Sequence, residues 1–123
     1  MILVDTSVWI DHLRATDEGL AESLDAGMAC THPFVVGELA CGNLRNRREV
    51  LALLRALPSA PVATDEEALE FIERRGLMGR GIGYVDIHLL AATALAGSDR
   101  LWTRDRRLAA VAEELGLASR AGR

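Results

Sequence analysis

The run Ile2-Leu3-Val4-Asp5-Thr6-Ser7 decides the fold that we expect for this chain. Its three consecutive apolar residues are typical of a short buried strand. No basic stretch precedes them, so the run does not have the form of a secretory signal peptide. Asp5 ends the strand, and aspartate is almost never fully buried unless it is paired. Asp5 is therefore an unusual residue at the end of a buried strand.

Three other acids stand in similar places. Glu38 and Asp86 each interrupt an apolar run, and Asp105 directly follows Leu101-Trp102-Thr103. Burying one unpaired charge is expensive, and two carboxylates 4 Å apart repel by roughly 4 kcal/mol at an effective dielectric constant of 20. The four acids therefore predict one acidic pocket that holds a cation.

Composition limits the class of protein. The chain has 123 residues, of which half are hydrophobic, so we expect a single domain over residues 1–123. No apolar run reaches the ~18 residues of a membrane span. The two cysteines do not form a disulfide framework, and they lie in apolar surroundings, which favours a reducing cytoplasm.

The charge balance excludes a strongly basic nucleic-acid-binding surface. All 14 basic residues are arginine and 18 residues are acidic, which gives a formal net charge of −4. Without the four featured acids, the remaining acids would balance the arginines. A polyanionic partner would therefore be bound by local arginines and by metal.

Strand-like and helix-like segments alternate along the chain, which predicts an α/β fold with a parallel sheet. We expect strands at 2–5, 28–31, 61–63, 101–103 and 117–119. We expect helices that begin near Ser7, Asp17, Pro33, Asn46, Thr64, Tyr84 and Asp105. Sites in such sheets form beyond the carboxyl ends of the strands. Glu38 and Asp86 are expected in first helical turns, where the helix dipole favours negative charge.

The four acidic motifs, in this order and at these spacings, resemble those of the PIN-domain ribonucleases, in particular the VapC-type toxins of toxin–antitoxin pairs. The resemblance covers nearly the whole chain, and none of the four acids is substituted. It implies a PIN-like three-layer fold, in which helices flank a five-stranded parallel sheet of order 3-2-1-4-5. The sequence pattern for the third and the fifth of these strands is weak.

The resemblance also implies metal-dependent hydrolysis of RNA phosphodiester bonds with one or two Mg²⁺ or Mn²⁺ ions, since carboxylates are hard ligands. Asp5 and Asp86 would hold the first ion, and Glu38 and Asp105 would complete the site. Hydroxyl groups of Thr6 and Thr103 would hydrogen-bond to these ligands. Arginine side chains near the site would contact RNA phosphates, and the candidates are Arg80, Arg104 and Arg106.

The partners implied by the resemblance are RNA, a cognate VapB-like antitoxin and a second copy of the chain in a homodimer. The helix that carries Trp9, Ile10 and Leu13 would help to form the antitoxin groove. Whether the RNA is tRNA, rRNA or mRNA stays open.

Other functions fit the residues less well. A signalling receiver domain would need a lysine near its acidic pocket, and the chain has no lysine. A dehalogenase-type phosphatase would need a second aspartate two residues after Asp5, where Ser7 stands. A non-catalytic PIN-like binding module is left as an alternative. His88 is expected to be a packed or surface histidine and not a ligand.

Overall fold

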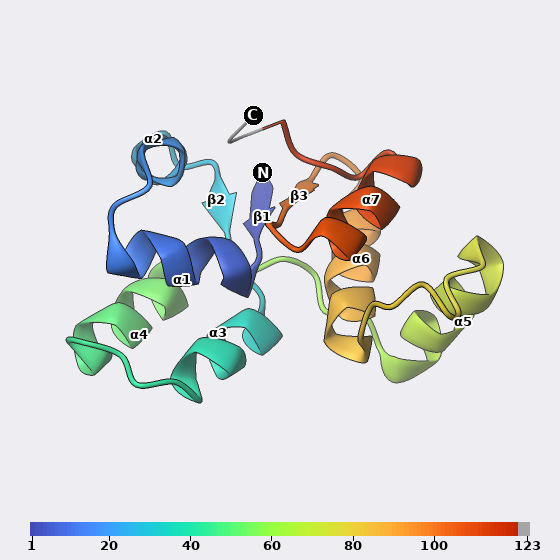
Figure 1. Cartoon of the computed structure of the whole chain (residues 1–123), viewed down its shortest axis with the longest axis horizontal. Coiled ribbons are helices and arrows are strands. Elements are labelled where there is room, and N and C mark those ends of the chain that lie inside the picture. Colours follow the sequence, from blue (N-terminus) through green and yellow to red (C-terminus); the bar gives the residue numbers. More distant parts are fainter. Residues whose placement is uncertain (121–123) are drawn as a thin grey trace.

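The computed structural model describes residues 1–120 of the chain, and residues 121–123, which the expected domain over 1–123 includes, lie outside the described part. Three strands and seven helices are found in the described residues (Figure 1). In chain order they are β1 (Ile2–Val4), α1 (Thr6–Arg14), α2 (Glu18–Asp25), β2 (Ala29–Cys30), α3 (Pro33–Ala40), α4 (Arg47–Ala56), α5 (Asp65–Arg75), α6 (Tyr84–Ala96), β3 (Arg100–Trp102) and α7 (Arg106–Glu114).

The strands form a parallel sheet of order β2-β1-β3, which confirms the α/β class. Ile2 of β1 is in register with Ala29 of β2 and with Arg100 of β3. In Figure 1, α1 to α4 lie on the β2 side of the sheet and α5 to α7 on the β3 side. Long α/β connections between parallel strands place the helices there.

The expected number of five strands is wrong for the described residues, which contain three. Two single parallel bridges join Thr31 to Ser59, and Leu101 to Ala118, at the outer sides of β2 and β3. The segment expected at 61–63 is not a strand, because Pro58 and Pro61 enclose the bridge and proline has no N–H for a ladder.

The core lies around β1, where Leu3 and Val4 are fully buried. Helix α6 is buried over the seven consecutive residues 87–93, as its nearly continuous apolar sequence predicts. A capping box between Thr64 and Glu67 starts α5, which confirms that prediction. Helix α1 begins one residue before the expected cap Ser7, directly after Asp5. Within residues 1–120, no helix is long and apolar enough to cross a membrane.

Candidate active site

Asp5 is the most buried of the four acids, with 6% of its surface exposed. It follows β1, and its backbone N–H donates to the carbonyl of Trp102, which places it at the carboxyl end of the central strand. Its Oδ2 accepts hydrogen bonds of 2.7 Å from Ser7 Oγ and from Thr103 Oγ1. Two hydroxyl donors on one carboxylate oxygen offset part of the free-energy cost of burying its charge.

The two hydroxyl groups also tie two turns together. Ser7 Oγ accepts a 3.0 Å bond from the backbone N–H of Arg104 and lies 3.4 Å from Thr103 Oγ1. Thr103 Oγ1 accepts a 3.1 Å bond from the N–H of Asp105. The turn after β1 and the turn after β3 are therefore joined through side chains. Sequence reasoning treated Ser7 only as a helix cap, although its position two residues after Asp5 was the available signal.

Asp105 is the N-cap of α7. Its Oδ1 accepts from the backbone N–H groups of Arg107 at 2.9 Å and of Leu108 at 3.1 Å. This is an ordinary capping role. It uses one carboxylate oxygen, and the side chain is exposed.

Asp86 lies in the first turn of α6, as predicted, and its Oδ2 accepts a 3.0 Å bond from the N–H of Gly83. Partial burial raises the pKa of Asp86, and the negative charges of Asp5, Asp105 and Glu38 raise it further. The charges of acids from three other parts of the chain therefore act on Asp86 at this end of the sheet.

Glu38 lies in the second turn of α3, so its expected place in the first turn is wrong. Helix α3 begins at Pro33 and is capped by His32, whose Nδ1 accepts from the N–H of Phe34. The helix dipole therefore gives Glu38 little help. Thr6 supplies a donor instead, because its Oγ1 lies 2.8 Å from Glu38 Oε1.

The chemistry of these donors fits a hard divalent cation. Each of the four acids has one oxygen in a hydrogen bond from a neighbouring protein group, and no second bond of this kind to their other oxygens is found in residues 1–120. The acids do not form a closed ligand set, since no three His, Cys, Asp or Glu side chains of the described part are arranged to hold a metal ion.

Two of the three candidate RNA-binding arginines are held by acids. Arg80 makes two 2.8 Å bonds to Glu114, and Arg104 contacts both Asp11 and Asp17. Arg106, in the first turn of α7, is exposed. Within residues 1–120 it has no salt bridge, so its guanidinium is available for a ligand.

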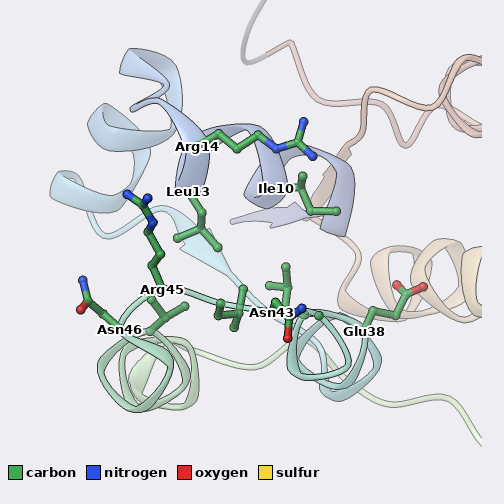
Figure 2. Close-up of a pocket in the computed structure, with 11 residues that line it drawn as sticks. Ile10, Leu13, Arg14, Glu38, Asn43, Arg45 and Asn46 are labelled. Atoms are coloured by element: carbon green, nitrogen blue, oxygen red, sulfur yellow. The ribbon is translucent and has the colours of Figure 1, made fainter.

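A pocket of about 690 Å³ lies between α1 and the segment from α3 to α4, and Glu38 is the one member of the four acids that lines it. Ile10 and Leu13 project into it from α1 and are each 40% exposed, whereas Trp9 of the same helix is buried in the core (Figure 2). Glu38 lines the pocket at one end and Arg45 at the other, and the side chain of Arg14 runs along its upper edge above Ile10 (Figure 2). The pocket therefore joins an apolar surface to the acidic site.

His88 and the two cysteines differ in their exposure to solvent. His88 is buried between the rings of Phe34 and Tyr84, which confirms the expectation of a packed histidine. Cys30 is buried, but Cys41 is exposed, so the expected apolar surroundings are wrong for Cys41. It follows directly after α3, where the chain turns into solvent.

Comparison with known proteins assigns nearly the whole chain to one family. Residues 2–114 match the PIN domain family model. Ribonuclease VapC32 of Mycobacterium tuberculosis, from the strains CDC 1551 and H37Rv, is 53% identical over 118 residues. The match spans 96% of this chain and 95% of the relative. The chain therefore belongs to the PIN-domain family and, within it, to the VapC-type ribonucleases.

Proposed function

We propose that this PIN-domain ribonuclease is the toxin of a type II toxin–antitoxin pair and hydrolyses RNA phosphodiester bonds with Mg²⁺ or Mn²⁺. The single observation that carries the site is the raised pKa of Asp86, which is caused first by partial burial and then by the negative charges of Asp5, Asp105 and Glu38. Perturbed carboxyl groups cluster where a protein does chemistry or binds a charged ligand. The 53% identity to a ribonuclease supports RNA as the substrate.

Asp5 and Asp86 would hold the first ion, with Asp105 and Glu38 completing the site for one or two ions. Mg²⁺ and Mn²⁺ suit carboxylate ligands of this kind. When bound, the ion would lower the pKa of a water molecule and offset negative charge on the phosphate. The protein's own part is to orient the acids.

Hydrogen bonds from the protein supply that orientation. Ser7 and Thr103 fix one oxygen of Asp5, and Thr6 fixes one oxygen of Glu38. Backbone N–H groups do the same for Asp86 and Asp105. The second oxygen of each acid is left for a ligand. Groups that orient metal ligands in this way typically change affinity or activity about 10–100-fold when they are removed.

RNA would be bound next to the acids by Arg106, which has no acidic partner in the described part of the chain. Arg80 and Arg104 would contact RNA only after leaving their carboxylates. A planar guanidinium is well suited to phosphate.

The test is RNA cleavage by the chain purified away from any antitoxin. Cleavage should require Mg²⁺ or Mn²⁺ and stop in EDTA. Asp5→Asn and Asp86→Asn should each abolish it, whereas Thr64→Ala, which removes only the cap of α5, should cleave like the unmodified protein. Unchanged cleavage by either Asn variant would refute the proposed site.

We further propose that the pocket between α1 and the α3–α4 segment receives the antitoxin, and that the chain is a single PIN domain that forms a homodimer in the cytoplasm. Ile10 and Leu13 offer exposed apolar surface that a soluble monomer would not be expected to gather beside a cavity. Leu13→Glu should weaken capture of the co-expressed antitoxin, and Leu69→Glu, on exposed α5, is the matched control. Equal capture by both variants would remove the pocket from the proposal.

A further inference from the structure

We propose that Arg107 is a positioning residue that sets the separation of Asp86 and Asp105 by holding the loop 76–83 against α7. The proposal rests on the proposed function, because it concerns the same carboxylates. In this role Arg107 neither contacts RNA nor binds the metal ion.

The first observation is the contact between Arg107 and Gly81. Gly81 has φ +77°, and an ideal Cβ built on it would lie 2.8 Å from Nη1, 2.9 Å from Cδ and 3.2 Å from Cζ of Arg107. Two of these distances are under 3.0 Å, so the Arg107 side chain lies against the backbone of Gly81 and would have to move if residue 81 had a Cβ. Glycine therefore serves here both for its conformation and for the close approach.

The second observation is that each partner of this contact is connected to one of the acids by a backbone hydrogen bond. The backbone N–H of Arg107 donates to Oδ1 of Asp105 at 2.9 Å. Two residues after Gly81, the N–H of Gly83 donates to Oδ2 of Asp86 at 3.0 Å. Arg107 thus fixes Asp105 through its main chain and reaches the loop that fixes Asp86 through its side chain.

The loop has a second attachment to the same helix. Arg80 forms a two-bond fork with Glu114, the last residue of α7. Leu77 at the start of the loop is buried, and Ile82 packs against the core. The loop is therefore fixed at both ends of α7, and the contact nearest to the acids is the one made by Arg107.

These attachments oppose a force within the site. Besides its burial, Asp86 is disfavoured in its ionised form by the negative charges of Asp5, Asp105 and Glu38, and this repulsion acts to separate Asp86 from Asp105 before a cation binds. Holding them close prepares the site for the ion, and such preorganisation is what surrounding residues contribute to metal affinity. Loss of the Arg107 side chain should therefore weaken metal binding by the RNA-free protein.

The decisive experiment measures Mn²⁺ binding to RNA-free protein by calorimetry, and RNA binding in EDTA by fluorescence anisotropy. Arg107→Ala should raise the Mn²⁺ dissociation constant about 10-fold. Arg107→Met keeps an atom at the level of Cδ against Gly81 but lacks the guanidinium group and its charge, and its Mn²⁺ dissociation constant should stay within about threefold of that of the unmodified protein. Arg55→Ala, which removes an exposed arginine of α4, is the control for loss of charge and should leave both Mn²⁺ affinity and RNA affinity unchanged.

Gly81→Ala gives a second variant that acts on the same contact and also strains the loop, because φ at this position is +77°. Its Cβ displaces the Arg107 side chain, so Mn²⁺ affinity should fall at least as far as in Arg107→Ala, and the double variant should be no weaker than the worse single one. Thermal unfolding in EDTA would confirm that all variants fold.

The outcomes separate cleanly. If both Arg107→Ala and Arg107→Met lower RNA affinity while Mn²⁺ affinity is unchanged, Arg107 is a phosphate contact and the positioning role is overturned. Unchanged Mn²⁺ affinity in Arg107→Ala overturns it as well. If the unmodified protein neither binds Mn²⁺ nor cleaves RNA, the proposed function itself fails, which is a different result.

Discussion

Replacing the two hydroxyl groups on Asp5 tests how this buried carboxylate is stabilised. Thr103→Val removes one donor to Oδ2 and keeps the shape of the side chain, and Ser7→Ala removes the other. The double variant leaves Asp5, which is 6% exposed, without a side-chain donor from residues 1–120.

The structure sets the size of the effect. A hydrogen bond to a charged group contributes about 1.5–3 kcal/mol. Each single variant retains the other donor at 2.7 Å, so we expect each to lower the free energy of unfolding by about 1 kcal/mol. The double variant should lose about 3 kcal/mol or more, because the carboxylate is then unpaired. The coupling between the two sites is therefore about 1 kcal/mol.

Urea unfolding at pH 7 in EDTA, followed by circular dichroism, measures all four proteins. Each single change should also lower the melting temperature by roughly 3–5 °C for a domain of this size. If the loss in the double variant equals the sum of the single losses within about 0.5 kcal/mol, the two hydroxyls act independently and the reasoning is refuted.

Three further changes test other parts of the structure. Asp86→Asn should raise the melting temperature in EDTA at pH 7, because the raised pKa of Asp86 means that its ionised form destabilises the folded protein. This gain should disappear below the unperturbed pKa of 3.8, because the carboxyl group is then protonated in both the folded and the unfolded protein. A pH series of melting curves checks it, and a gain that persists in acid would contradict it. Arg104→Ala should lower the free energy of unfolding by about 1 kcal/mol through loss of its contacts with Asp11 and Asp17; a fall in RNA affinity without a stability change would assign Arg104 to RNA instead. Thr64→Ala should cost about 1 kcal/mol of stability, measured by urea unfolding, with unchanged cleavage.

The sequence was most informative where one residue type stood against its surroundings. Asp5 and Asp86 were found because acids in apolar runs conflict with burial, and the alternation of segments gave the α/β class. Such conflicts are local, so a single sequence displays them. The capping box at Thr64 and Glu67 was found for the same reason, since both of its residues lie within one helical turn.

Other features depend on contacts between distant residues, which no local pattern records. Ser7 contacts Thr103, which lies 96 positions away in the sequence, and Arg104 forms salt bridges with Asp11 and Asp17 among many surface acids. The expected strand at 61–63 failed because two prolines left room for a single bridge at Ser59. The contact between Arg107 and Gly81 could not be predicted either, because a glycine in a loop is compatible with many different backbone conformations and contacts.

The order in which the sheet is assembled bears on how the cell makes this enzyme. A ribosome releases β1 first, and its neighbour β3 only after about a hundred residues have been added. A nascent chain that stops before Leu101 contains Asp5 and Asp86 but lacks Thr103 and Asp105. Such a fragment lacks β3 and two residues of the proposed site, so we expect it not to cleave RNA.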